Sequence, residues 1–588
     1  MASDSMASYQ AVHRSVPRID RVAKLTGEAL FAEDIQMPGG VLHGKLLRSP
    51  HPYARILRID IHRAEQLPGV KAVATAADLP SVRYGQYLKD EEYFARDVVR
   101  LVGEKVAAVA ATTAEIAEAA LGLITVEYDV LEPLDDPFAA MQPDAPLLHP
   151  QLMDYQVVAM AAPGGGNFAS KNSLGRGEPD AALARADRVF EAVYTTEMVH
   201  QAYLEPHACL AQYNSDGTYT VHTTTQGQFP LRNMLAEVLG VSQNRVRVIP
   251  TEIGGGFGGK ISMQDEAAAA VLARKAGRPV RIVMTRAEDF LCGVPRAGFH
   301  IAIKTGVSRD MRLVARTMDI VMDNGAYGRG GVLLAGSVPM FAEGPYRIPD
   351  IRVDVRCVYT NKAISSSFRA PGGPQTNFAI ECEMDRIAEA MGFDPIAFRR
   401  ANLMPENHVT LAGMTLRNVA ATETLDAALR LSGYDPAQVR PGPSRGRGIA
   451  VGNWNVGGMP SGAVVKMNDD GSASLLTGVV DLTGLHTALA QIVAEALALP
   501  VDRVTVKTLD TESAPHSTSS VGSQALKSMG TAALQAAEEV RRQLLELAVQ
   551  DVDAPPDRME LVGGFVRVRG DAQRRVGVPA LLKRALAA

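Results

Sequence analysis

The sequence has few cysteines and no paired ones, and this shortage excludes two kinds of metal site. Its 588 residues include four cysteines, none of them in a C-x-x-C pair. Iron–sulfur clusters and structural zinc sites need several thiolates at defined spacing, so we expect neither in this chain. We interpret all four as buried, reduced thiols: Cys209, Cys292, Cys357 and Cys382.

The sequence also lacks long apolar runs and an excess of one charge sign. Lysine and arginine number 60 against 65 acidic residues, a net charge of -5, so no basic field favours nucleic acid. No run of about 18 apolar residues is present, which predicts no membrane span. Residues 1–18 are polar and lack the apolar region of a signal peptide, so we predict a cytoplasmic protein.

Clusters of proline and glycine divide the chain. The sequence predicts a mixed α/β (α+β) protein, because helix-like and strand-like runs alternate along most of its length. Strand-like runs flank an alanine-rich helical run in the first region, which predicts a small α/β domain. We predict that domain at 18–137, a linker at 138–176, and two larger regions at 177–432 and 445–588, the latter two separated by a break rich in proline, glycine and arginine at 441–448.

The two larger regions contain a weak internal repeat. Ala236 and Ala494 are 258 positions apart, as are Arg245 and Arg503, and the residues around each pair are similar. Each copy reads as a helix, a short turn and a β-branched strand, followed by a loop of small residues. We therefore predict two related halves whose small-residue loops together enclose one elongated anionic ligand.

The glycine-rich loop at 254–260 allows three interpretations from its residues alone. Such loops let backbone N–H groups approach a phosphate closely. The spacing fits G-x-x-x-x-G-K, but Ile261 stands where a nucleotide-hydrolysing phosphate loop needs Ser or Thr. It also fits G-x-G-x-x-G, but the next strand-like run ends in Thr285 and Arg286 rather than the acidic residue of a dinucleotide fold. A tight turn without a ligand is the third interpretation.

Several separated motifs resemble those of one family, the molybdopterin-binding subunits of the xanthine dehydrogenase/aldehyde oxidase type. The glycine loop, I-G-G-G-F-G-G-K from Ile253, is similar to that family's signature. The resemblance extends from about residue 21 to 567 and includes an N-terminal run similar to the family's hammerhead domain. Further matching motifs are Thr225-Gln226, Leu204-Glu205-Pro206, Gly344-Pro345-Tyr346 and the F-R-A-P-G-G-P-Q run at 368–375.

The resemblance implies a two-part molybdopterin-binding domain after the hammerhead domain, the second part truncated. It implies molybdenum held by molybdopterin, in the cytosine dinucleotide form, with no protein atom as a direct metal ligand. The implied reaction is hydroxylation of a C–H of an N-heterocycle or an aldehyde, with water as the oxygen source. Electrons would pass to partner subunits that carry iron–sulfur clusters and FAD, because this chain has motifs for neither.

Residue roles also follow from the resemblance. Gln226 matches the glutamine that hydrogen-bonds the metal's oxo group, and Arg369 matches the arginine beside the substrate, whose charge stabilises developing negative charge. An ordinary strand-end glutamine and a structural salt bridge are the alternatives for these two. We predict Arg296 and Phe368 at the substrate. The predicted cofactor-binding residues are Gln226, Gly255, Gly256, Phe257, Gly258, Arg369, Ser520, Gly522 and Ser523.

The sequence departs from the family pattern at three positions near the site. Ile261 stands where xanthine-oxidising members have a glutamate, and Ser366 stands where carbon-monoxide-oxidising members have a cysteine. Neither replacement can do the chemistry of the residue it replaces, so we expect neither substrate. The family's D-x-G-Q-G motif reads Asp481-Leu482-Thr483-Gly484, without the glutamine.

The family's catalytic glutamate lies in a G-x-G-E segment for which the sequence has no counterpart after Gly530. The run from Leu101 to Glu104 matches superficially but belongs to the small domain, away from the predicted site. General base catalysis contributes about 10²–10⁴-fold, so we expect this chain alone to be nearly inactive. Either a short partner subunit supplies the segment, or the chain is a truncated, inactive cofactor-binding or scaffold subunit.

Overall fold

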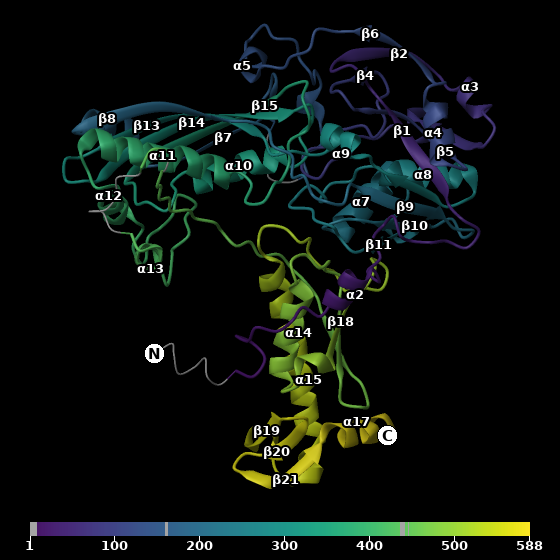
Figure 1. Ribbon diagram of the computed structural model, residues 1–588, viewed down its shortest axis with the longest axis vertical. Coiled ribbons are helices and arrows are strands. Elements are labelled where there is room, and N and C mark those ends of the chain that lie inside the picture. The colour runs from purple at the N-terminus through teal and green to yellow at the C-terminus, as the bar shows by residue number, and fades with distance from the viewer. Residues whose placement is uncertain (1–8, 159–162, 435–441, 445, 588) are drawn as a thin grey trace.

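The structure is a computed structural model that describes residues 9–158, 163–434, 442–444 and 446–587. Two large β-sheets with their helices form a wide body, and a narrow stalk projects from it (Figure 1). The predicted mixed α/β fold is confirmed. Residues 159–162 of the predicted linker and residues 441 and 445 of the predicted break lie outside the described residues. Within the described ranges, no helix is long and apolar enough to cross a membrane.

The first sheet joins the small N-terminal domain to the body. Its strand order is β11-β10-β9-β12-β1-β5-β3, and the junction is the parallel pairing of β1 with β12. Helix α4 (Ala114–Leu121), capped by Thr113, packs on β1 and β5. The strands are β1 (Leu42–Arg48), β3 (Val70–Thr75), β5 (Lys105–Ala111), β9 (Ala208–Tyr213), β10 (Tyr219–Thr223), β11 (Val246–Pro250) and β12 (Val280–Val283). A separate sheet of β4 (Val98–Val99), β2 (Ala54–Asp60) and β6 (Thr125–Val130) completes the small domain.

The second sheet has long strands and one covered face. Its order is β7-β15-β14-β13-β8, and buried residues alternate along β13 and β15, as expected when one face packs on a core. Helices α10 (Gly331–Phe341) and α11 (Gly373–Met391) cover that face. The strands are β7 (Phe168–Arg176), β8 (Arg188–Thr196), β13 (Gly298–Val307), β14 (Leu313–Gly325) and β15 (Asp350–Tyr359), and helices α12 (Pro395–Asn402) and α13 (Ala421–Ser432) follow α11.

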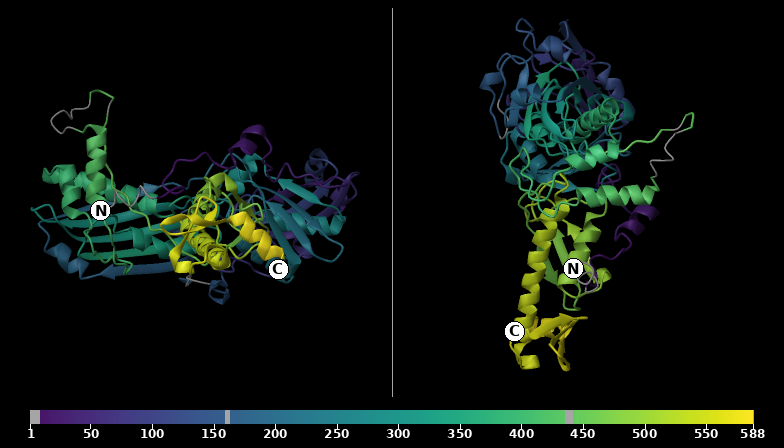
Figure 2. Two further views of the ribbon diagram at one scale, coloured as in Figure 1. Left: turned by 90° about the horizontal axis from the view of Figure 1, so that it is seen from below. Right: turned by 90° about the vertical axis from the view of Figure 1, so that its left-hand side faces the viewer.

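The stalk has its own small core. Helices α14 and α15 pack against each other and against a three-stranded sheet, β16-β17-β18, around Leu475, Leu489 and Met529. A second small sheet and α17 lie at the far end of α15 (Figure 2). The bounds are β16 (Val464–Met467), β17 (Ala473–Thr477), α14 (Leu485–Ala496), β18 (Val504–Thr508), α15 (Ala525–Leu547), β19 (Met559–Val562), β20 (Phe565–Val568), β21 (Asp571–Gly577) and α17 (Val578–Ala587).

The internal repeat is present in the fold. The short 3-10 helix Gln243–Arg245 and strand β11 in the body correspond, at the predicted spacing of 258 residues, to the 3-10 helix Val501–Arg503 and strand β18 in the stalk. Helix α7 (Gln228–Leu239) precedes the first copy as α14 precedes the second, and α8 (Glu266–Ala276) follows the first as α15 follows the second. The stalk is therefore a second, smaller version of the α/β unit that carries the glycine loop.

The N-terminal arm reaches back to the stalk, which the sequence did not predict. The side-chain carboxylate of Glu495 on α14 accepts hydrogen bonds from the backbone N–H groups of Gln10, Ala11 and Val12. Ala11 is buried in the stalk core. The arm thus ties the start of the chain to the second half of the molecule.

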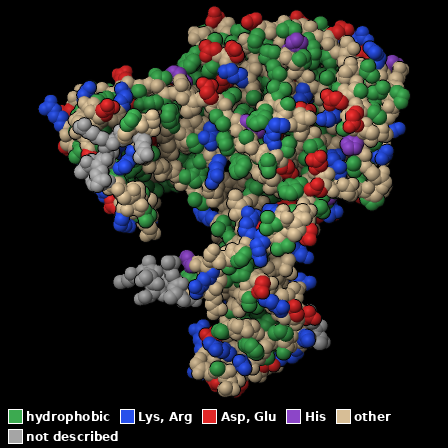
Figure 3. Space-filling model, viewed as in Figure 1, with side chains coloured by type: hydrophobic (Ala, Val, Ile, Leu, Met, Phe, Trp, Pro, Cys, Tyr) green, Lys and Arg blue, Asp and Glu red, His purple; other side chains and the backbone are tan. Residues whose placement is uncertain are grey.

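Buried polar side chains join the small domain to the second sheet. Arg329 makes a two-pronged ion pair with Glu91, with both distances 2.7 Å, and both residues are buried. Glu104, the superficial glutamate match, is also buried here and accepts a hydrogen bond from the Tyr327 hydroxyl. Figure 3 shows acidic and basic side chains interspersed over the visible face, with no large area of one sign.

His149 lies in this junction, and its lowered pKa predicts that the stability of the fold depends on pH. Its Nε2 is 2.8 Å from the carbonyl oxygen of Ala326, and burial, with the charge of Arg100 as a smaller cause, lowers its pKa from 6.5 to about 3. Between pH 6.5 and about pH 3, the His149 ring is therefore protonated in the unfolded chain but neutral in the folded protein. We expect stability to fall by about 1.4 kcal/mol per pH unit below pH 6.5 from this group.

The measurement is urea denaturation at pH 7 and pH 5 for the wild type and His149→Phe. Asp90 affects the pH dependence of stability in the opposite direction. Burial raises its pKa to about 7, so the stability that it contributes is lost as pH rises. Comparing the two proteins isolates His149, since Asp90 is present in both. Equal pH slopes would show that His149 is not the group responsible.

Candidate cofactor and active site

The glycine loop lies between β11 and α8 in a conformation that needs its glycines. Gly255 and Gly258 have φ values of 95° and 107°, in the region that side chains disfavour. A Cβ on Gly258 would lie 2.3 Å from the backbone oxygen of Ser367. Phe257 itself has a φ of 52°, and its side chain is 42% exposed. The loop therefore holds a strained non-glycine residue at the surface, between two glycines that allow close approach.

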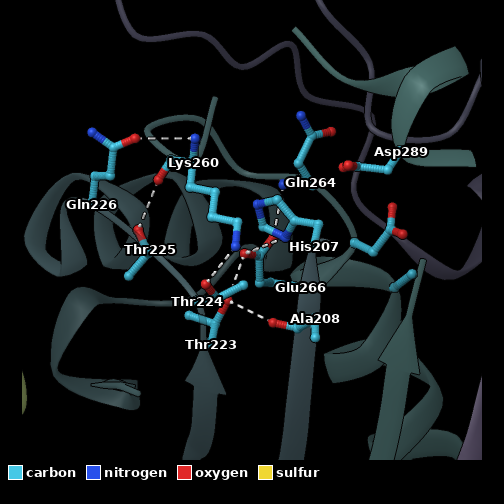
Figure 4. Close-up of polar contacts among 12 residues, drawn as sticks. His207, Ala208, Thr223, Thr224, Thr225, Gln226, Lys260, Gln264, Glu266 and Asp289 are labelled. Carbon is cyan, nitrogen blue, oxygen red and sulfur yellow. Dashed lines mark hydrogen bonds and ion pairs between the residues drawn. The ribbon is translucent and has the colours of Figure 1, made fainter. Parts of the chain in front are cut away.

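Lys260, at the end of this loop, is fully buried and points into the protein. Its Nζ lies 2.7 Å from Glu205 Oε2 and above the Tyr203 ring. It also lies 3.1 Å from Thr224 Oγ1 (Figure 4). Burial lowers the pKa of Lys260, and the carboxylate of Glu205 opposes that effect. A phosphate-loop lysine must reach a ligand's phosphates, so this geometry disagrees with the nucleotide-hydrolase interpretation.

Gln226 connects the glycine loop to the second half of the chain. Its Oε1 accepts a hydrogen bond from Gly258 N at 2.8 Å, and its Nε2 donates to the carbonyl oxygen of Ser520 at 2.9 Å. The backbone N–H of Ser520 donates to the Gln226 carbonyl oxygen at 2.8 Å. A Cβ on Gly256 would lie 2.6 Å from Gln226 Oε1. The amide is thus held in one orientation at the contact between the two predicted loops.

The end of the second loop is open to solvent. Gly522 and Ser523 are exposed and have φ values of 59° and 55°. The Ser523 hydroxyl accepts a hydrogen bond from Trp454 Nε1 at 3.0 Å, and the Trp454 ring stacks on Phe341 at 4.9 Å. Trp454, the one tryptophan of the sequence, therefore links this loop to α10 of the body. Its position was not predicted, because nothing in its local sequence marks it.

Arg369 and Phe368 lie beside the glycine loop. The backbone N–H of Arg369 donates to the carbonyl oxygen of Phe257 at 2.8 Å. Among the described residues, no carboxylate lies within ion-pair distance of the exposed Arg369 guanidinium, which argues against a structural salt bridge. Arg296 Nη2 donates to the carbonyl oxygens of both Phe368 and Arg369 at 2.8 Å, and its guanidinium lies over the Phe368 ring. Arg296 therefore supports this backbone, and its contact with a substrate stays a prediction.

A buried polar layer lies under the loop. Glu266 is fully buried and accepts hydrogen bonds from Thr223 Oγ1 and Gln264 N (Figure 4). His207 Nδ1 is 4.0 Å from Glu266, and burial lowers the pKa of His207 to about 3, so the ring is neutral. These residues and Glu205 were not predicted as part of the site. Only the Leu204-Glu205-Pro206 motif signalled any of them.

Among the departures from the family pattern, Asp481 has a structural role for its side chain. Asp481 accepts hydrogen bonds from Gly484 N and Leu485 N, so it caps the start of α14. Ser366 is buried and its N–H donates to the carbonyl oxygen of Pro295. Ile261 is half-buried directly after Lys260.

The arrangement fits an anionic, hydrogen-bond-accepting group such as a pterin with a nucleotide tail. A Cβ at Gly255, Gly256 or Gly258 would meet Tyr203, Gln226 or Ser367, so these glycines let the loop backbone pack closely on the protein. Exposed Gly522 and Ser523 lie just ahead of α15. Helix N-termini carry partial positive charge and free N–H groups, which suit phosphate. No group of three or more His, Cys, Asp or Glu side chains suited to a metal occurs in the described part of the chain.

Comparisons with known proteins agree with this arrangement. Residues 26–132 match the family model "aldehyde oxidase and xanthine dehydrogenase, a/b hammerhead domain", and residues 163–403 and 424–587 match two models of a molybdopterin cofactor-binding domain. A probable xanthine dehydrogenase subunit of Bacillus subtilis is 34% identical over 519 residues, which cover 86% of this chain and 67% of that protein. The nicotinate dehydrogenase large molybdopterin subunit of Eubacterium barkeri is 33% identical over 73% of this chain and 98% of its own length.

Solved structures show the same fold. The quinoline 2-oxidoreductase from Pseudomonas putida 86 superposes with a TM-score of 0.88 and 26% identity, covering 98% of this chain and 76% of that chain. The CO dehydrogenase from Oligotropha carboxidovorans has the same TM-score at 25% identity, covering 99% and 77%. The chain belongs to the xanthine dehydrogenase family and is one of its molybdopterin-binding subunits.

Proposed function

We propose that the chain is the cofactor-binding subunit of a molybdenum hydroxylase that oxidises a C–H of an N-heterocycle or an aldehyde. The observation that carries this proposal is the contact at Gln226, where the glycine loop of one half meets the small-residue loop of the other. A bound molybdenum–molybdopterin group, in the cytosine dinucleotide form, would supply the two-electron oxidation with water as the oxygen source. The electrons would leave to iron–sulfur and FAD partner subunits.

Each half of the chain would hold one part of that group. Gln226 Nε2 donates one proton to Ser520, which leaves its second proton for the cofactor. The loop residues Gly255, Gly256, Phe257 and Gly258 would present backbone to the pterin, and the loop at Ser520, Gly522 and Ser523 would bind the anionic tail. Arg369, without an ion-pair partner among the described residues, would orient the substrate and stabilise negative charge on it.

The names of two relatives favour an N-heterocycle as the substrate. One oxidises nicotinate and the other quinoline, by their names, and both rings contain nitrogen. Ile261 gives this chain no carboxylate where a purine would need one, and Ser366 provides no thiol. Arg296 and Phe368 lie beside Arg369 and would contact the substrate there.

The proton-accepting carboxylate would come from outside these 588 residues. In the described part of the chain, no carboxylate contacts Gln226 or Arg369, and Glu205 is already bound to Lys260. We propose that a short partner subunit supplies it. The alternative is an inactive scaffold subunit, and metal content separates the two.

The test is co-expression with the polypeptides encoded beside this chain, followed by molybdenum and nucleotide analysis of the purified complex. We expect about one molybdenum and one cytidine nucleotide per chain, and turnover of N-heterocycles such as quinoline or nicotinate. A complex that never contains molybdenum would refute the enzyme and favour the scaffold.

A further inference from the structure

Strands β9 and β16 occupy the same place in the two halves but have different surroundings. Each is the first strand of its copy and pairs antiparallel with the next, β10 or β17. The second strands match closely, because buried and half-buried residues alternate identically along β10 and β17. The first strands do not match. In β9, residues 208–211 are at most 3% exposed, whereas Val464 in β16 is 46% exposed and Lys466 is also exposed.

The difference arises from a missing neighbour. On its other side β9 pairs antiparallel with β12, Val280 opposite Ala211 and Ile282 opposite Cys209. Strand β16 is the edge of its sheet, and no described residue pairs with its outer side. An unpaired edge leaves backbone N–H and C=O groups free to bind another strand.

The chain takes different courses after the corresponding helices α8 and α15 of the two halves. Helix α8 has 11 residues, about 16 Å, and the chain returns directly into β12. Helix α15 has 23 residues, about 34 Å, and carries the chain to the far end of the stalk, where β19, β20 and β21 form a sheet of their own (Figure 2). Among the described residues, the second half thus has no counterpart of β12.

The approach to β16 is apolar and continuous with the candidate site. Val456 and Met459, in the irregular segment before the strand, are 53% and 55% exposed. Gly457 N donates to the carbonyl oxygen of Gly522, and Gly462 N donates to that of His516, so this segment lies against the second loop. A strand added at β16 would therefore lie next to the loop that we assign to the cofactor.

We propose that the outer edge of β16 binds a short strand of a second polypeptide, the partner that completes the active site. The strand runs antiparallel to β16 and resembles β12 (Val-Arg-Ile-Val), with β-branched residues alternating with polar ones. Its apolar side chains cover Val464, Val456 and Met459. This inference rests on the proposed function only for the partner's role, because the edge itself is defined by the repeat.

The experiment is hydrogen exchange, measured by mass spectrometry, on the isolated chain and on the complex obtained by co-expression with the neighbouring polypeptides. We expect residues 464–467 to exchange at least about tenfold more slowly in the complex, while β9 stays protected in both samples. A matched pair of variants follows. Lys466→Pro in β16 should abolish assembly, and Lys507→Pro in β18, the opposite edge strand of the same sheet, should not.

Each outcome decides the inference or the function. Unchanged exchange at 464–467 in a complex that contains molybdenum and turns over would overturn the inference and leave the proposed function intact. Protection in a complex without molybdenum would support the inference and refute the function. Concentration-dependent protection in the isolated chain would show that a second copy occupies the edge, which also overturns the inference. If Lys466→Pro does not fold, the wild-type exchange data still decide.

Discussion

Replacing Lys260 with methionine is expected to lower the free energy of unfolding by about 3–5 kcal/mol, the usual cost of removing one partner from a buried ion pair. Methionine keeps the length of the apolar stem but removes the ammonium group that lies 2.7 Å from Glu205 Oε2. The carboxylate of Glu205 would then keep only the hydrogen bonds from Gly254 N and Thr224 Oγ1. Its other oxygen is already buried without a partner, so little water can compensate.

The control is the same substitution at an exposed ion pair. Lys304 Nζ lies 2.7 Å from Glu191 on the open face of the second sheet, and both side chains are largely exposed. Lys304→Met should change stability by about 0–1 kcal/mol, although the distance is the same. Urea denaturation of both variants and of Lys260→Met/Glu205→Gln completes the comparison. We expect the double variant to be less destabilised than the two single changes summed. A loss below about 1 kcal/mol for Lys260→Met would contradict the prediction.

The same change should loosen the candidate site. Gln226 N donates to the carbonyl oxygen of Lys260, and Gln226 Oε1 accepts a hydrogen bond from Lys260 N. A shift of the Lys260 backbone would therefore also move the Gln226 side-chain amide, which joins the two halves. Hydrogen exchange at 254–260 in the chain without cofactor measures this independently of activity, and we expect faster exchange in Lys260→Met than in Lys304→Met.

The repeat and the glycine loop could be predicted because their signals are local. A helix, a short turn and a β-branched strand each have a recognisable residue pattern. The two copies of this pattern, 258 residues apart, correspond in the structure to the 3-10 helices and strands of the two halves. Five glycines in six residues have no reasonable place within a helix or strand. The repeat predicted two loops that share one ligand, but it did not predict the contact between Gln226 and Ser520, which are 294 positions apart.

The inward direction of Lys260 could not be predicted, because it depends on partners distant in sequence. Its carboxylate partner, Glu205, lies 55 positions earlier in the chain, before the three strands β9, β10 and β11. Nothing in the local sequence shows whether a lysine after a glycine loop reaches a ligand or an internal acid. The docking of the N-terminal arm on Glu495 is a stronger case, because its contacts span more than 480 positions.

Arg369→Ala is expected to lower turnover of the loaded complex by about 10²–10³-fold while leaving its molybdenum content unchanged. The two effects separate because Arg369 contacts the loop only through its backbone. Its N–H donates to Phe257, and its carbonyl oxygen accepts from Arg296, and both contacts survive the loss of the side chain. The lost guanidinium would act on charge that develops in the transition state, so kcat should fall more than KM rises. Arg369→Lys should recover only part of the rate, because an ammonium lacks the planar fork.

Arg309→Ala, at a largely exposed arginine far from the loop, serves as the matched control and should leave kcat unchanged. Full turnover in Arg369→Ala at normal molybdenum content would remove Arg369 from the catalytic site.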